Sequence, residues 1–235
     1  MKKAYFDYMK DALLGLLAIF VYFGINKYAA LPLALLNIDV NSLNVHVKMC
    51  YSLMVDVVIL VLLYLIFRKT LKKDFKDLKK HHLEYFYKYI KYWFIALAIM
   101  MFSNALIIII TGGGIANNEE LIRSTLNKSP LLVFIAAVVF APMIEELVFR
   151  LSLRKIIPYN WIFILVSGLV FGSMHVLTSY QTPTDLLYII PYGAPGAVFA
   201  YTLVKSKNIF VPIGLHFMHN GLLLSLQFIV LIFGL

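Results

Sequence analysis

The sequence contains seven apolar runs, each long enough for one helix to cross the hydrocarbon core of a lipid bilayer. An α-helix rises about 1.5 Å per residue, so about 20 apolar residues span the roughly 30 Å of that core. The runs lack the alternation of barrel strands, and lipid admits only helices or closed barrels, because every backbone polar group needs an internal partner. We therefore expect an all-α fold, a polytopic transmembrane helical bundle of about seven spans, forming a single membrane domain over residues 1–235. The runs cover residues 13–36, 49–67, 92–111, 131–156, 161–177, 186–204 and 209–235.

The composition excludes a water-soluble fold. Hydrophobic residues make up 62% of the chain and charged residues only 14%, whereas soluble domains contain about 25% charged residues. The formal net charge of +9 is the one feature that suggests nucleic acid as a partner. Basic residues of membrane proteins gather in cytoplasmic loops, which explains the charge equally well. We expect the lipid bilayer as a partner and no nucleic acid.

The distribution of lysine and arginine predicts the orientation in the membrane. With the N-terminus in the cytoplasm, 17 of the 21 basic residues fall on the cytoplasmic side, nine of them between residues 68 and 91. This asymmetry is typical of the cytoplasmic face. We expect a multi-pass protein of the cell membrane with a cytoplasmic N-terminus, an external loop at 112–130 and an external C-terminus. The stretch 68–91 is expected to be either a plain basic cytoplasmic loop or an amphipathic helix on the anionic inner surface.

Two of the runs contain residues that interrupt helices. The sixth run carries Pro191, Gly193, Pro195 and Gly196, which predicts a broken helix, tolerated in membranes where neighbouring groups satisfy the freed backbone atoms. Gly221 in the last run could divide that run in two, which would raise the count from seven spans to eight.

The fourth run carries charged residues, and these are costly inside a bilayer. Glu145 and Glu146 are adjacent, and Arg150 follows four residues after Glu146. On a helix Glu146 and Arg150 share a face and can pair, whereas Glu145 points about 100° away. One carboxylate would then be neutralised while the other stays free, as catalysis requires. A purely structural ion pair that locks two helices is the alternative.

Polar residues of two later runs lie at a similar depth. His175 lies late in the fifth run, and His216 and Asn220 are four residues apart in the seventh. Counted from the inner ends of the runs, Glu145 and His216 lie about 14–15 Å deep. By the same count Asn220 and His175 lie about 20–22 Å deep. Independent structural residues have no reason to agree in depth, so we interpret these residues as one site.

Three motifs carry a resemblance to a known family. The segment 142–150 (PMIEELVFR) resembles an EExxxR motif, residues 171–175 (FGSMH) an FxxxH motif, and residues 216–220 (HFMHN) an HxxxN/D motif. This order and spacing are similar to those of the CPBP intramembrane proteases, which include the type II CAAX prenyl endopeptidases and the bacterial Abi proteins. The resemblance covers about residues 131–224, from the fourth span onward. Leu151 departs from the glycine that follows the arginine in many members.

The resemblance implies an intramembrane endopeptidase with a catalytic core at 131–224. It implies that Glu145 and His175 activate a water molecule, while His216 and Asn220 stabilise the oxyanion. Glu146 and Arg150 would orient the helix and tune Glu145. The implied substrate is a membrane-embedded or membrane-associated peptide, such as a prenylated C-terminus, a pheromone precursor or a bacteriocin-related peptide, and no residue distinguishes among them.

A metal ion is an open alternative in this chemistry. Glu145, His175 and His216 could supply a zinc site of two histidines and one glutamate. The same residues also suit a metal-free glutamate protease, and the sequence contains no HExxH motif that would favour zinc. We favour a site without a cofactor, with zinc as the alternative.

Two functions from other classes remain open at this stage. A non-catalytic immunity or scaffold protein could keep the same fold, because a fold does not fix a function. A transporter or proton relay could use Glu145, Asp56 and the histidines, although the sequence shows no internal repeat. Asp56 lies in the second run, where it could pair with Lys27 or line the entrance to the site.

Overall fold

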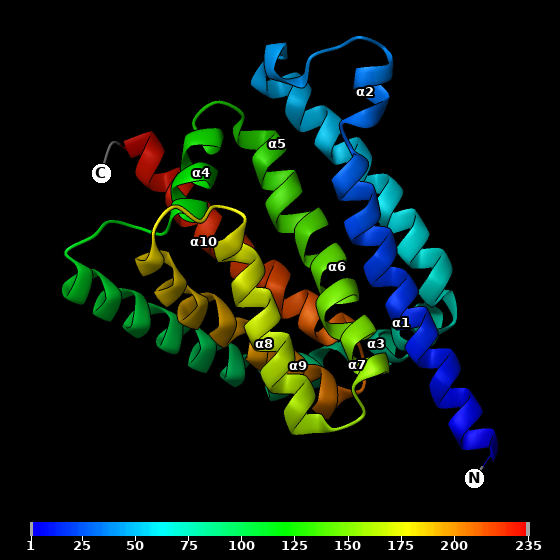
Figure 1. Ribbon diagram of the computed structural model, residues 1–235. Coiled ribbons are helices and arrows are strands. Elements are labelled where there is room, and N and C mark those ends of the chain that lie inside the picture. Colours follow the sequence, from blue (N-terminus) through cyan, green and yellow to red (C-terminus); the bar gives the residue numbers. More distant parts are fainter. Residues whose placement is uncertain (1, 234–235) are drawn as a thin grey trace.

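The computed structural model describes residues 2–233, and all regular elements of this part are helical. Figure 1 shows them as a bundle, so the all-α prediction is confirmed. In chain order the elements are α1 (Lys2–Tyr28), α2 (Leu31–Leu35), η1 (Val40–Ser42), α3 (Val45–Thr111), α4 (Asn117–Leu126), α5 (Pro130–Phe134), η2 (Ile135–Phe140), α6 (Ala141–Glu146), η3 (Leu147–Ser152), α7 (Leu153–Ile156), α8 (Asn160–Leu177), η4 (Pro183–Tyr188), α9 (Ile189–Ser206) and α10 (Phe210–Phe233).

Six helical segments of the described residues are long and apolar enough to cross a membrane. The polytopic bundle is thereby confirmed, and α3 contains two of the seven runs of the sequence. The last run is not divided, because α10 continues through Gly221. The six segments are Tyr5–Leu35, Val45–Thr111, Pro130–Ile156, Asn160–Leu177, Pro183–Ser206 and Phe210–Val230.

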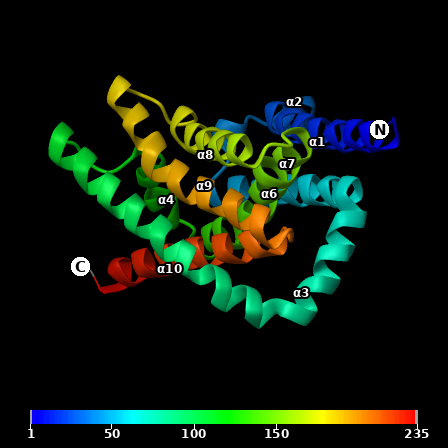
Figure 2. The same cartoon turned by 90° about the horizontal axis from the view of Figure 1, so that it is seen from below.

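The second and third runs are joined by helix. We expected two separate helices, and the 67 residues of α3 are two helices that meet at a kink without an intervening loop; at 1.5 Å per residue their summed length is about 100 Å. That length exceeds the hydrocarbon core about threefold, and Figure 2 shows α3 sweeping round the bundle in an arc. The backbone departs from helical geometry at His81, with φ −124° and ψ 15°. Residues 68–91 are helical on both sides of this kink, and their placement on the inner membrane surface stays a prediction.

The two arms of α3 pack on different parts of the bundle. In the first arm, Ile59 and Leu63 are fully buried in a cluster that also holds Val148 of η3. In the second arm, Trp93 is buried in a second cluster with Phe199 of α9. The curved helix therefore closes the bundle on two sides, and its second arm approaches α9 and α10.

The fourth run is helical from Pro130 to Ile156, but its winding changes along its length. Two π-helical segments, η2 and η3, flank the short α-helix α6 that carries Glu145 and Glu146. In η3 the Ser152 hydroxyl donates to the Leu147 carbonyl, five residues earlier, at 2.8 Å. π-Helical turns inside α-helices occur frequently at functional sites. The run is therefore helical, as expected, but it is not wound as one uniform α-helix.

The expected break in the sixth run is also wrong. The helix α9 continues through Pro195 to Ser206, and a 3-10 segment, η4, precedes it. The small residues serve close packing instead, because a Cβ atom on Gly172 of α8 would lie 2.4 Å from the Ile189 carbonyl oxygen and 2.9 Å from the Gly193 nitrogen. Small residues of this kind let membrane helices approach closely. The contact brings His175 of α8 next to α9.

Candidate active site

A charged cluster without exposure to solvent lies between η3, α6 and α10. The Arg150 Nε lies 3.2 Å from Glu146 Oε2, and both side chains are 0% exposed. On its other oxygen, Glu146 receives the His216 Nδ1 at 2.8 Å. The Arg150 guanidinium also donates to the Gly196 carbonyl at 3.4 Å and lies 4.1 Å from the centre of the Phe171 ring. The predicted pairing of Glu146 with Arg150 is present, and it holds His216 as well.

Glu145 is more accessible than its neighbour. Its side chain is 20% exposed, and its Oε2 lies 3.7 Å from the His216 Nε2. That oxygen is buried and has no hydrogen-bond partner among the described residues. A buried carboxylate oxygen without a partner is a place where a water molecule or a substrate group can bind. The Glu146 Oε2 also lacks a hydrogen bond, so exposure is what separates the two carboxylates: 0% for Glu146 and 20% for Glu145.

The hydrogen bond of His175 fixes its tautomer when the ring is neutral. Its Nδ1 lies 3.0 Å from the Phe171 carbonyl oxygen. A carbonyl oxygen only accepts, so Nδ1 carries the proton and Nε2 offers a lone pair. The ring stacks on Tyr192 of α9, with centres 4.9 Å apart and planes at 25°. Tyr192 in turn receives the Asn118 amide at 3.5 Å. These contacts hold the ring in place, with Nε2 free to accept a proton.

His219 has the opposite tautomer. The indole nitrogen of Trp93 donates to the His219 Nδ1 at 3.2 Å. An indole N–H can only donate, so Nδ1 must be unprotonated and the neutral ring carries its proton on Nε2. No other hydrogen bond engages this ring within residues 2–233. Sequence reasoning missed His219, and nothing in the sequence indicated that Trp93 would reach it.

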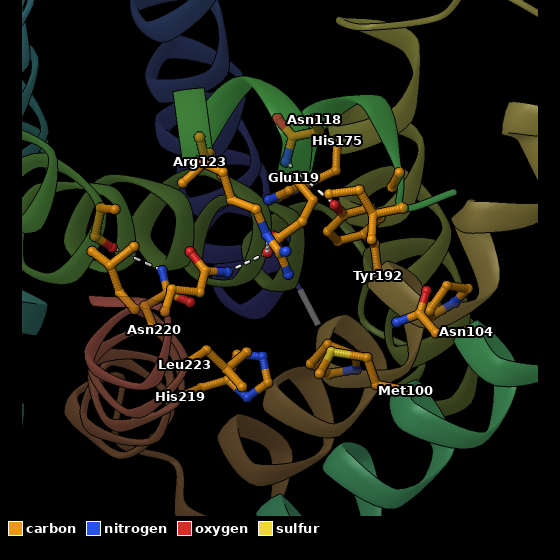
Figure 3. Close-up of a pocket in the computed structure, with 18 of the residues that line it drawn as sticks. Met100, Asn104, Asn118, Glu119, Arg123, His175, Tyr192, His219, Asn220 and Leu223 are labelled. Atoms are coloured by element: carbon orange, nitrogen blue, oxygen red, sulfur yellow. Dashed lines mark hydrogen bonds and ion pairs between the residues drawn. The ribbon is translucent and has the colours of Figure 1, made fainter. Parts of the chain in front are cut away.

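Three of the histidines border one cavity of about 660 Å³. His175, His216, His219 and Asn220 line it together with apolar residues of α3, α4, α9 and α10, and Figure 3 shows His175, His219 and Asn220 arranged around the open space. The Asn220 amide donates to the Ala137 carbonyl at 2.8 Å, which leaves its second amide hydrogen available. The cavity lining therefore contains the Nε2 lone pair of His175 and the hydrogen-bond donors of His219 and Asn220, set among apolar side chains.

The charged cluster lies behind this lining, with His216 as the link. Glu145, Glu146 and Arg150 do not border the cavity, and no hydrogen bond or ion pair in the described chain joins Glu145 to His175. The structure thus brings all six predicted residues into one neighbourhood, but it connects Glu145 to His216 rather than to His175. Their catalytic roles stay predictions.

Asp56 does not have the partner that the sequence suggested. Among the described residues no ion pair joins it to Lys27, whose amino group lies instead 5.4 Å from the centre of the Tyr28 ring. Asp56 is also absent from the lining of the cavity. Asp56 instead lies close enough to Glu145 and Tyr22 for its charge to act on both.

The alternative zinc set does not converge on one point. Glu145, His175 and His216 are described, and no group of three or more His, Cys, Asp or Glu side chains within residues 2–233 is arranged to hold a metal ion. Both ring nitrogens of His216 face carboxylates, and the Nδ1 of His175 faces a carbonyl oxygen. Zinc needs at least three ligands at about 2.0–2.2 Å, so these residues do not fit it.

We expect peptide cleavage by the purified protein to survive exhaustive chelation, and the protein to contain no stoichiometric zinc. The reason is that no three His, Cys, Asp or Glu side chains among the described residues are arranged to hold one metal ion. Activity and metal content would be measured before and after chelation, with circular dichroism as the control for folding. Loss of activity on chelation and its return with added zinc would contradict this expectation.

Comparisons with known proteins agree with the three motifs. Residues 127–222, which contain all six predicted site residues, match the family described as type II CAAX prenyl endopeptidase Rce1-like. The chain is 26% identical over 187 residues to YdiL of Bacillus subtilis, a candidate membrane peptidase, covering 77% of this chain and 73% of that protein. It is 28% identical over 142 residues to the membrane-embedded CAAX protease MroQ of Staphylococcus aureus, covering 55% and 54%.

A third relative and the solved structures add less. The chain is 27% identical over 114 residues to the UPF0177 protein YvdC of Lactococcus lactis, covering 47% of this chain and 41% of that protein. No solved structure matches the chain. The chain therefore spans about half the length of MroQ and less than half of YvdC. The resemblance drawn from the three motifs is nonetheless confirmed, because residues 127–222, which contain all three motifs, match the model of the family described as type II CAAX prenyl endopeptidase Rce1-like.

Proposed function

We propose that the chain is an intramembrane endopeptidase that hydrolyses a peptide bond of a membrane-embedded or membrane-associated peptide. One observation carries the proposal. A buried Arg150–Glu146–His216 cluster leaves Glu145 more accessible, and it lies directly behind a cavity lined by His175, His216 and Asn220. An apolar cavity with a few convergent polar groups is typical of a substrate site.

The proposed reaction begins with a water molecule held between Glu145 and His175. The water attacks the carbonyl carbon of the scissile bond and gives up a proton to Glu145, with the lone pair of the His175 Nε2 as its second acceptor. The carbonyl oxygen becomes an oxyanion that Asn220 stabilises with its remaining amide hydrogen. His216, whose ring nitrogens face Glu146 and Glu145, is assigned the second donor by the family resemblance. The C–N bond then breaks, and the proton passes to the leaving amine. Two products result, a new carboxyl terminus and a new amino terminus.

The tautomer of His219 adds a third donor to this scheme. Its Nε2–H belongs to a ring that lines the cavity one residue before Asn220 in the chain. Oxyanion stabilisation depends on donors that are held in place before the reaction. Because the Trp93 indole fixes the proton on Nε2, this donor needs no rearrangement when the oxyanion forms.

We expect His219→Phe to lower kcat by about 10²–10³, the usual effect of removing one oxyanion donor. His219→Gln should retain more activity, because its amide nitrogen can take the place of Nε2. Both variants would be compared with the wild type in kcat and KM, with thermal unfolding as the control. Equal kcat in the wild type and His219→Phe would remove His219 from the scheme.

The function itself is tested by the peptides that cells release. Cells producing the wild-type protein and cells producing Glu145→Gln at equal membrane levels would be compared by mass spectrometry of the medium and the membrane fraction. We expect at least one peptide whose release depends on Glu145. Identical peptide sets would overturn the proposal and favour a non-catalytic scaffold or immunity role.

A further inference from the structure

The basic segments of the chain gather at one end of the bundle. Lys155 of α7 lies 2.6 Å from Asp11 of α1. At the turn between α9 and α10, the Asn208 amide donates to the Asp74 carbonyl at 2.7 Å and to the Asp77 carboxylate at 2.9 Å. The first contact joins α7 to the first part of α1, and the other two join the basic stretch of α3 to the turn after α9. In Figure 1 the first turns of α1, α7 and the base of α8 all lie in the lower part of the view.

The distribution of basic residues indicates that this end of the bundle faces the cytoplasm. The four segments joined in these pairs hold most of the lysines and arginines of the chain, and residues 68–91 alone hold nine. Segments close to the ends of membrane helices that carry an excess of Lys and Arg remain in the cytoplasm. The structure strengthens the argument, because it places segments that are far apart in the sequence on one face.

The cavity extends to the opposite end. Its lining includes Asn118, Glu119 and Arg123 of α4, a helix in the upper part of Figure 1. His175 lies in the last turn of α8, far from the basic junction where α8 begins. The Arg123 side chain is 52% exposed and pairs with Glu119 at 3.1 Å. Figure 3 shows both side chains projecting over the open space. The rim of the cavity is therefore polar and lies on α4.

We infer that the substrate reaches the site from the non-cytoplasmic face of the membrane, past α4. The inference rests on the proposed function and specifies its substrate class: an exported peptide, or a segment of a membrane protein that lies outside the cytoplasm next to an apolar stretch. The apolar walls suit the apolar stretch, and the polar rim suits the segment that leaves the bilayer. Residues 68–91 would then face the cytoplasm and take no part in substrate entry.

The sidedness can be tested without any substrate. In a Cys50→Ser background, Glu120→Cys places a thiol on the exposed surface of α4, and Lys80→Cys places one on the exposed basic stretch of α3. A membrane-impermeant maleimide should label Glu120→Cys in intact cells and Lys80→Cys only after permeabilisation. Labelling of Lys80→Cys in intact cells, or of Glu120→Cys only after permeabilisation, would overturn the inference.

Entry is tested by blocking the rim from outside. Ile115 lines the cavity and is 40% exposed, whereas Glu120 does not line it. A bulky impermeant maleimide applied to intact cells should cause loss of the Glu145-dependent peptide in Ile115→Cys but not in Glu120→Cys. Undiminished release from fully labelled Ile115→Cys would overturn the inference. If no peptide depends on Glu145, the proposed function fails, while the labelling pattern still decides which face the rim occupies.

Discussion

Replacing Glu145 with glutamine is expected to leave a folded protein that no longer cleaves its substrate. Glutamine keeps nearly the same shape but cannot accept the proton of the attacking water. General acid–base catalysis contributes about 10²–10⁴ to rate, so kcat should fall at least about 100-fold. The only ion pair of this side chain within residues 2–233 is the one with His216, at 3.7 Å, and the fold should tolerate the change. The measurement is turnover of the Glu145-dependent peptide by purified protein.

Folding supplies the control for this result. The thermal unfolding midpoint and the yield from membranes should match those of the wild type, because the buried Glu146 and its two partners are untouched. A Glu145→Gln protein that still turns over peptide at the wild-type rate would exclude Glu145 as the base. An unfolded protein would instead show that Glu145 has a structural role.

The spans and one ion pair could be predicted from the sequence because they depend on local pattern. Run length and hydropathy mark membrane helices, and a spacing of four places Glu146 and Arg150 on one face. The pair forms at 3.2 Å even though Arg150 lies in the π-helical segment η3. The wider winding of η3 rotates Arg150 relative to Glu146 by only a fraction of a turn, which is too little to separate two long side chains. The depth count likewise placed His216 near Glu145, and the structure has them in contact.

Features that depend on packing between distant segments could not be predicted. Trp93 and His219 are 126 residues apart, and each alone is an ordinary core residue. The lysines at 68–91 suggested a solvated loop as readily as a helix, and tertiary contacts such as Asn208 with Asp74 decide for the helix. Pro191 lies in the first turn of α9, where a missing N–H costs nothing. The run of Pro and Gly therefore indicated close helix packing rather than a break.

Replacing Arg150 with alanine is expected to destabilise the protein strongly. The change would leave the Glu146 carboxylate 0% exposed without its guanidinium partner, and removing one member of a buried ion pair costs about 3–5 kcal/mol. It would also remove a donor to the Gly196 carbonyl and a cation lying 4.1 Å from the centre of the Phe171 ring. Folded yield in detergent and the thermal unfolding midpoint should both fall, well beyond any change in Glu145→Gln.

A double variant separates the charge from the packing of the arginine. If the stranded carboxylate causes the loss, adding Glu146→Gln to Arg150→Ala should restore part of the stability, since an amide is much less costly to bury than an anion. Adding Glu145→Gln to Arg150→Ala should restore less, because Glu145 is the more exposed of the two and is not the ion-pair partner of Arg150. Equal instability of Arg150→Ala and the Glu146→Gln double variant would assign the loss to packing against Phe171 instead. Equal rescue by both glutamine substitutions would show that the two carboxylates share the arginine charge, and the division of roles between Glu145 and Glu146 would then be wrong.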